Sequence, residues 1–140
     1  MRTEQGQLLM DEKKVLQMGR TFMLDAQQSE VESDYIAAEG IYHVCCELFS
    51  GLMGQSSPYE TDARGEYMHA LFRCAMLPQI SQQEKLRYLN QACELAAELE
   101  RETGEMEYTI AVGCMEEELE ELNKTLERQI YQKQQDMIQF

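Results

Sequence analysis

The stretch EKLRYLNQACELAAELERETGEMEYTIAVG, residues 84–113, constrains the fold more than any other part of the sequence. On a helix at about 100° per residue, the segment 82–102 has apolar side chains over roughly half of its circumference. Polar residues, among them Arg87, Glu94 and Arg101, fill the opposite arc. An apolar arc this wide suits a helix that contacts neighbours on two sides, whereas a two-stranded coiled coil needs only a narrow seam. We therefore expect several helices packed side by side.

Composition and helix-start signals extend this pattern to the whole chain. The 140 residues are 44% hydrophobic and 27% charged, and only two of them are prolines. The sequence has no long alternating run of β-branched residues that would indicate a strand. Ser57 followed by Pro58 and Glu60 is typical of a helix N-terminus, and Ser81 with Glu84 has the spacing of a capping box. The sequence predicts an all-α protein with one domain, 1–140, built from antiparallel helical hairpins. The five expected helices span about 4–27, 33–50, 58–77, 82–102 and 106–136.

The expected helices differ in how much of their surface is apolar. Segment 33–50 has a narrow polar stripe that includes Glu39, His43 and Glu47, so we expect it to be the most buried helix. The last helix, in the segment 106–140, keeps one apolar seam after its first turns. Its members are Met115, Leu119, Leu122, Leu126, Ile130 and Met137. We expect this helix to cap the chain's own core, with pairing to a second copy as a homodimer as the alternative.

Charge, cysteine count and hydropathy exclude several classes of function. The formal net charge of −14 argues against direct binding of nucleic acid through its phosphates and leaves a basic protein as a candidate partner. No apolar stretch approaches the roughly 18–20 residues that span a bilayer, and the first residues lack the apolar core of a signal peptide. The five cysteines, without a C-x-x-C pair, suit reduced and buried thiols. We expect a cytoplasmic protein that does not bind membranes.

Both histidines have carboxylates at helical spacing. Glu66 and His69 have the spacing of a di-iron carboxylate helix, but the second motif that such a site needs is absent. Glu39, His43 and Glu47 follow one stripe and can bind a divalent ion, although an ordinary surface ion pair explains the same spacing. No nucleophile elbow, phosphate-binding loop or metalloprotease motif is present. We therefore expect a non-enzymatic protein without metal, cofactor or catalytic residues.

Residues 66–113 resemble a tetratricopeptide-like helical repeat. A helix ending ALFRCAML leads through a loop to a second helix, EKLRYLNQACELAAEL, and through a turn to a third, EYTIAVGCM. Small residues stand where helices of such repeats cross closely: Ala70, Ala75, Ala92, Ala96, Ala97, Ala111 and Gly113. Glycines inside helices, here Gly19, Gly40 and Gly65, each cost about 1 kcal/mol relative to alanine unless close packing compensates. The family's tryptophan is missing, and an irregular helical bundle is the alternative.

The resemblance implies a scaffold whose concave face binds a peptide or helix of another protein. Such a module acts as an adaptor, a small chaperone or a regulator. Aromatic side chains commonly anchor such interfaces. The candidates in this sequence are Tyr42, His43, Tyr67, Phe72 and Tyr88.

A run of glutamates in the last helix supports a different function. We expect its side chains on the exposed side of that helix, as an acidic ridge of Glu116, Glu117, Glu118, Glu120 and Glu121. Such a ridge can occupy the nucleic-acid groove of another protein. The alternative function is thus an acidic inhibitor of a nucleic-acid-binding protein, a nucleic-acid mimic of the anti-CRISPR type. A solvated face without function explains the same charges, and a helical subunit of a larger assembly is a third interpretation.

Overall fold

The computed structural model describes residues 4–54 and 57–138, and for residues 4–10 it describes the backbone alone. These residues form five α-helices and no strand, which confirms the predicted all-α class. The helices are α1 (Glu4–Val31), α2 (Tyr35–Ser50), α3 (Glu60–Ala75), α4 (Gln82–Thr103) and α5 (Met106–Ile138). None of these helices is long and apolar enough to cross a lipid bilayer.

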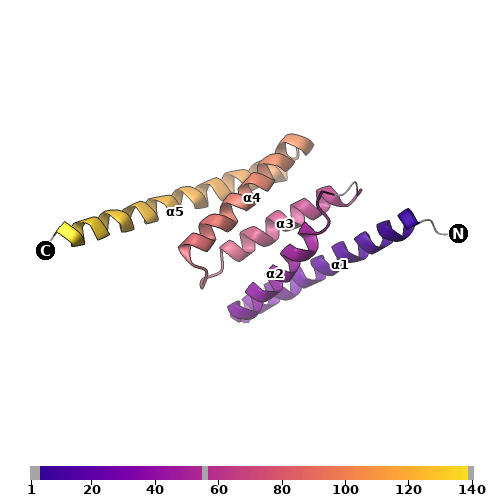
Figure 1. Ribbon diagram of the computed structural model, residues 1–140, viewed down its shortest axis with the longest axis horizontal. Helices are drawn as coiled ribbons and strands as arrows, with labels where there is room; N and C mark the ends of the chain where they lie inside the picture. The colour runs from indigo at the N-terminus through magenta and orange to yellow at the C-terminus, as the bar shows by residue number, and fades with distance from the viewer. Residues whose placement is uncertain (1–3, 55–56, 139–140) are drawn as a thin grey trace.

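The main contacts between helices follow the order of the sequence. Helix α1 packs on α2, α2 on α3, α3 on α4 and α4 on α5, and a smaller contact joins α1 to α3. Figure 1 shows this succession from α1 at one edge to α5 at the other, with the two termini at opposite ends. The central hydrophobic cluster takes residues from all five helices.

Side-chain caps begin two of the helices. The carboxylate of Asp34 accepts a hydrogen bond from the backbone N–H of Ala37 at 3.2 Å and caps α2. The Ser81 hydroxyl accepts one from the backbone N–H of Glu84 at 3.2 Å and caps α4, as the sequence predicts. Gly104 ends α4 in the left-handed conformation, with φ of 67°. Local sequence therefore sets both ends of α4.

Ser57 does not cap α3, contrary to the prediction. Its hydroxyl accepts a hydrogen bond from the backbone N–H of Tyr59, two residues on, at 3.1 Å. The same hydroxyl donates to the Glu12 carboxylate of α1 at 2.5 Å. This short turn delays the start of α3 to Glu60.

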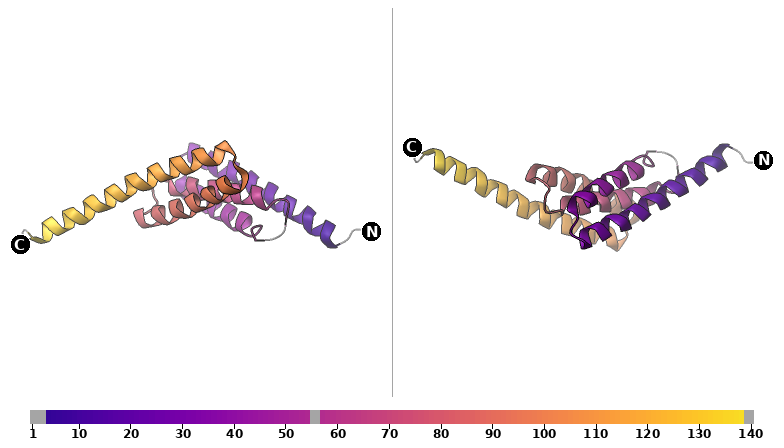
Figure 2. Two further views of the ribbon diagram at one scale, coloured as in Figure 1. Left: turned by 90° about the horizontal axis from the view of Figure 1, so that it is seen from above. Right: turned by 90° about the horizontal axis from the view of Figure 1, so that it is seen from below.

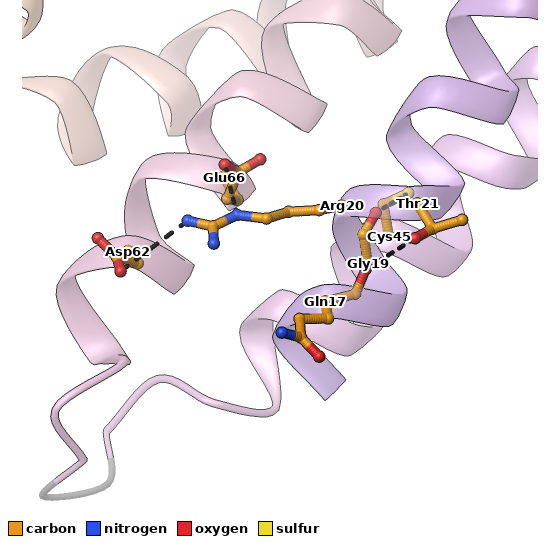
Figure 3. Close-up of polar contacts among 7 residues, drawn as sticks. All are labelled: Gln17, Gly19, Arg20, Thr21, Cys45, Asp62 and Glu66. Atoms are coloured by element: carbon orange, nitrogen blue, oxygen red, sulfur yellow. Dashed lines mark hydrogen bonds and ion pairs between the residues drawn. The ribbon is translucent and has the colours of Figure 1, made fainter. Parts of the chain in front are cut away.

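Small residues allow close helix crossings at some of the predicted positions and not at others. Ala70, Ala75, Ala92 and Ala96 are buried in the core, as expected. A Cβ added at Gly19 would lie 2.4 Å from Cε1 of Phe49, so α1 and α2 can approach this closely only with glycine there. The carbonyl oxygen of Gly19 also accepts a hydrogen bond from the Cys45 thiol at 3.6 Å, as Figure 3 shows. By contrast, a Cβ at Gly40 or Gly113 meets no atom within 4 Å, so close packing does not explain these two glycines.

Helix α2 is buried on one face alone, which corrects the expectation that it is the most buried helix. Its buried residues are Ala38, Tyr42, Cys45 and Phe49. On its other sides, Ile36 is 82% exposed and Val44 is 42% exposed. Helix α2 packs against both α1 and α3, yet the longer helix α4 has six buried residues whereas α2 has four.

The cysteines are free thiols, but not all of them are buried as predicted. Cys45 and Cys74 are buried, and Cys46 and Cys93 are half-buried. Cys114 is exposed, because its position on α5 faces away from α4. Burial raises the pKa of the Cys45 thiol to about 11 and that of Cys74 to about 12.

Helix α5 covers the core with its first half and extends beyond it with its second. Met115 and Leu122 are buried, whereas Ile130 is 58% and Met137 is 75% exposed. Figure 2 shows the C-terminal part of α5 projecting away from the other helices. With 33 residues, α5 is about 50 Å long, whereas the 22 residues of α4 reach about 33 Å. Helix α5 is therefore longer than the helix that it packs against.

Candidate partner-binding site

A shallow hollow of about 300 Å³ opens to solvent between α2, α3 and α4, and we call it the α2–α4 groove. It is lined by His43, Cys46, Glu47, Tyr67, Leu71, Arg87, Tyr88 and Gln91. The residues from each helix are one to four positions apart, so helical geometry brings them to one face. His43, Tyr67 and Tyr88, three of the predicted aromatic anchors, thus meet in one place.

One wall of the groove is a chain of ring and cation contacts. Nε2 of His43 and the hydroxyl of Tyr88 are 3.1 Å apart, within hydrogen-bond distance, and the two ring centroids are 6.3 Å apart. The Arg87 guanidinium lies 5.1 Å from the centroid of the Tyr88 ring, in cation–π geometry. Tyr88 is buried, and this burial raises the pKa of its hydroxyl. The buried tyrosine therefore orients two exposed polar side chains at the groove surface.

The floor of the groove is apolar. Leu71 is buried, and Tyr67 and Cys46 are half-buried against the core. Burial raises the pKa of the Cys46 thiol to about 12, so the thiol is protonated at neutral pH. Burial, together with nearby Cys46, also raises the pKa of Tyr67. A protonated, half-buried thiol is a weak nucleophile and acts here as part of an apolar surface.

Arg87 differs from the arginines that tie the helices together. Arg20, Arg64 and Arg73 each form ion pairs with carboxylates of other helices. Arg87 is exposed and has its contact with Tyr88, and it forms no carboxylate pair within the described part of the chain. Within the described residues, therefore, no carboxylate lies within ion-pair distance of the Arg87 guanidinium, although Glu47 also lines the groove.

Tyr42, expected to line a binding groove, is instead fully buried. Its hydroxyl donates a hydrogen bond to the Glu30 carboxylate of α1 and accepts one from Nε of Arg73 at 3.2 Å. Nη2 of Arg73 also lies 2.9 Å from the Glu30 carboxylate. These three residues join α1, α2 and α3, so Tyr42 holds the scaffold together and is not accessible to a partner.

Phe72, the fifth aromatic candidate, is partly buried against the core and does not line the groove. The following residue, Arg73, donates a hydrogen bond to the Tyr42 hydroxyl, so both neighbours contact buried parts of the molecule. The sequence indicated an aromatic residue on a helix, but it did not indicate the direction of the side chain.

The acidic ridge is largely exposed, as predicted for Glu117, Glu120 and Glu121. Lys124 lies 3.3 Å from Glu120 and 3.8 Å from Glu121, so it balances part of their charge. Glu118 is only half-exposed, because it lies toward α4, where Lys85 is 3.9 Å away. The ridge is therefore less uniformly negative than its sequence suggests.

A second hollow, of about 270 Å³, lies between α1, α3 and the start of α5. Arg20 crosses its edge, with Nε 3.2 Å from Glu66 and Nη2 3.9 Å from Asp62, as Figure 3 shows. His69 and Tyr108 also line it. The Glu66 and His69 pair was visible in the sequence, but Arg20 was not linked to it. Within the described residues, no group of three or more His, Cys, Asp or Glu side chains is arranged to hold a metal ion.

No family model, curated protein or solved structure matches this chain. The resemblance to tetratricopeptide-like repeats therefore depends on the sequence pattern of residues 66–113. The case for a function depends on the geometry of the α2–α4 groove.

Proposed function

We propose that this protein is a non-enzymatic interaction module that binds a peptide or helix of another protein in the α2–α4 groove. The observation that supports this most is the combination of an apolar floor with a fixed polar wall. Leu71, Tyr67 and Cys46 form the floor, while Tyr88 holds His43 and Arg87 at the surface. This combination of an apolar patch and oriented polar groups is typical of interfaces with a few dominant anchor residues.

The chemistry of the groove suits one kind of bound segment. An apolar side chain of the partner rests on Tyr67 and Leu71, and a carboxylate or backbone carbonyl accepts hydrogen bonds from Arg87. Arg87 is well suited to this because its planar guanidinium donates several hydrogen bonds in a fixed geometry. A module of this kind acts as an adaptor, a small chaperone or a regulator, on a scaffold with tetratricopeptide-like packing.

The openness of the groove favours a polypeptide over a small-molecule substrate. Small-molecule sites commonly enclose most of the ligand surface. The α2–α4 groove is shallow and open to solvent, and its cysteine is protonated at neutral pH. A segment of polypeptide that crosses α2, α3 and α4 makes fuller use of such a surface.

The test compares two exposed arginines of α4. Arg87→Glu changes the groove, whereas Arg101→Glu makes the same charge change on the same helix away from the groove lining. Tagged wild-type protein is used to capture partners from its native cell at low salt and at 0.5 M salt. The segment of each captured partner that binds is then made as a peptide, and its affinity for the protein is measured by calorimetry. We expect Arg87→Glu to weaken binding at least about tenfold and Arg101→Glu to change it less than about twofold. Equal effects of the two variants would exclude the groove as the binding site.

The acidic ridge supports inhibition of a nucleic-acid-binding protein as a second candidate function. Glu120 and Glu121 have side chains that are 69% and 72% exposed, so they are accessible to a basic protein. In that case capture yields a basic partner that is lost at 0.5 M salt. Replacing Glu117, Glu118, Glu120 and Glu121 by glutamine would then abolish inhibition, while Arg87→Glu would leave it unchanged.

A further inference from the structure

The first half of α5 has an apolar stripe on the side that faces away from α4. Met106 is 70% and Ile110 is 60% exposed, and Gly113 and Cys114 are also exposed. Ile110 follows Met106 by four positions, and Gly113 and Cys114 follow Ile110 by three and four, so the four residues lie on one face of the helix. Met115, which packs into the core, lies on the opposite side. We call Met106, Ile110, Gly113 and Cys114 the outer stripe.

The outer stripe continues directly into the acidic ridge. Glu117 follows Gly113 by four positions, and Glu120 and Glu121 follow Glu117 by three and four. All three carboxylates are exposed. The same face of α5 is therefore apolar in its first two turns and carries three carboxylates in the next two, with Lys124 3.3 Å from Glu120 and 3.8 Å from Glu121. Figure 1 shows α5 at the edge of the stack, with none of the other four described helices on its far side.

We propose that this face of α5 binds an amphipathic helix of another protein, apolar along one half and rich in lysine or arginine along the other. Met106 and Ile110 provide the apolar contact. A Cβ at Gly113 would meet no atom within 4 Å, so a helix can approach the α5 backbone closely at this point. The basic half of the partner helix lies along Glu117, Glu120 and Glu121.

Charge complementarity selects this occupant over a second copy of the chain. In a parallel pair of α5 helices, the glutamates of one copy face those of the other. In an antiparallel pair, the glutamates of one copy face the apolar residues Met106 and Ile110 of the other. Like charges in contact and unpaired carboxylates on an apolar surface are both unfavourable, and the net charge of −14 adds to the repulsion. A basic helix avoids both costs.

This surface is separate from the α2–α4 groove, which no residue of α5 lines. The inference is therefore independent of the proposed function of that groove, and either can fail alone. It shares Glu117, Glu120 and Glu121 with the second candidate function and differs from it because it also requires the apolar contact of Ile110.

The probe for this surface is a synthetic, end-capped helical peptide of about 18 residues, with leucines along one half and lysines along the other. A control peptide carries glutamates in place of the lysines. Binding to the full chain is followed by fluorescence anisotropy, and protection of Cys114 from alkylation locates the peptide. We expect the lysine peptide to bind saturably and to slow alkylation of Cys114, and the glutamate peptide to do neither.

Matched variants separate the apolar and charged parts of the surface. Ile110→Glu should weaken binding of the lysine peptide at least about tenfold, whereas Ile36→Glu, at a more exposed isoleucine of α2, should change it less than about twofold. Replacing Glu117, Glu120 and Glu121 by glutamine should weaken binding and reduce its dependence on salt, whereas Glu94→Gln should do neither. Circular dichroism checks that each variant remains helical.

Four results would overturn the proposal. The first is no binding of the lysine peptide, or equal binding of the glutamate peptide. The second is equal loss of binding in Ile110→Glu and Ile36→Glu. The third is binding that depends on the glutamates but not on Ile110, because the outer stripe then has no part in it. The fourth is a dimer of the free chain, measured by light scattering, that Ile110→Glu converts to a monomer, because a second copy then occupies the face.

Discussion

The two halves of α5 carry the same kind of apolar seam but have different surroundings. As far as Leu126, the seam packs on the core, and Met115 and Leu122 are buried. Beyond Leu126, Ile130 and Met137 are largely exposed. We call residues 106–126 the packed half of α5 and residues 127–138 its free end. The same pattern thus gives a packed surface in one half and a solvent-exposed surface in the other.

The difference teaches that a seam shows which face of a helix can pack, but not whether a neighbour is there to pack against it. Helix α4 runs antiparallel to α5 and is shorter, so the free end extends past the start of α4. Near that point Leu126 and Ile130 line a hollow of about 420 Å³ together with Ser81 and Gln83. The length of the neighbouring helix, rather than the seam, decides where packing ends.

The largest effect is expected from removing side-chain volume in the packed half. Leu122→Ala should lower the free energy of unfolding by about 2–4 kcal/mol, because it removes buried methyl groups and leaves a cavity. Ile130→Ala in the free end should lower it by less than about 0.5 kcal/mol. Urea denaturation measures both. Equal destabilisation by the two variants would mean that the free end is packed as well.

Glycine variants compare a close helix crossing with an open helix face. Gly19→Ala should destabilise the protein by about 1–3 kcal/mol, because the added Cβ overlaps the ring of Phe49. Gly113→Ala adds a methyl group in open space and should stabilise the helix by up to about 1 kcal/mol. Thermal unfolding of both variants should give shifts of opposite sign. A stabilising shift in Gly19→Ala would contradict the close contact of Gly19 with Phe49, and a destabilising shift in Gly113→Ala would contradict the open surroundings of Gly113.

The pH dependence of stability above about pH 10 should differ between variants of Tyr42, which is buried among α1, α2 and α3, and variants of Tyr131 in the free end. Burial, with the hydrogen bond to Glu30, raises the pKa of Tyr42 to about 12. Because this pKa lies above the value of about 10 in the unfolded chain, the neutral phenol contributes stability that is complete below pH 10 and is lost as pH rises toward 12. Tyr42→Phe should reduce the slope of stability against pH between about 10 and 12. Tyr131→Phe is the control, since this exposed side chain changes its surroundings little on unfolding. Urea denaturation at several pH values measures the slopes, and unchanged slopes in Tyr42→Phe would exclude the predicted role.

The smallest effect is expected from shortening the free end. A variant that ends at Lys133 removes exposed residues such as Met137 and Ile138. Its free energy of unfolding should differ from that of the full chain by less than about 0.5 kcal/mol. A loss of more than about 2 kcal/mol would show that the removed residues stabilise the fold, either in the same molecule or between copies.

Features set by local sequence could be predicted, and those set by the packing of distant segments could not. The start of α4 at Ser81 follows from one hydroxyl and a backbone N–H three residues away. The contact of Tyr42 with Glu30 and Arg73 needs three helices in their final arrangement, so the tyrosine resembled a surface anchor in the sequence. The exposure of Ile36 likewise depends on the absence of a helix over that side of α2, within the described residues.

The candidate site was predicted in part for the same reason. His43, Tyr67 and Tyr88 line one groove, but His43 is exposed, Tyr67 is half-buried and Tyr88 is buried. Arg87, which completes the wall, is the neighbour of Tyr88 in the sequence and was assigned only to a polar arc. The outer stripe at the start of α5 is exposed because none of the other described helices packs on that side of α5, which the sequence of α5 alone does not indicate.

Hydrogen–deuterium exchange along α5 tests most directly whether the packed part of the molecule ends near Leu126. We expect backbone amides of residues 111–126 to exchange at least about 100-fold more slowly than those of residues 129–137, because opening the packed half requires loss of core contacts. Uniformly slow exchange through residue 137 would contradict this and would mean that another part of the chain, or a second copy, covers the free end. Repeating the measurement at a tenfold lower protein concentration would distinguish these two cases.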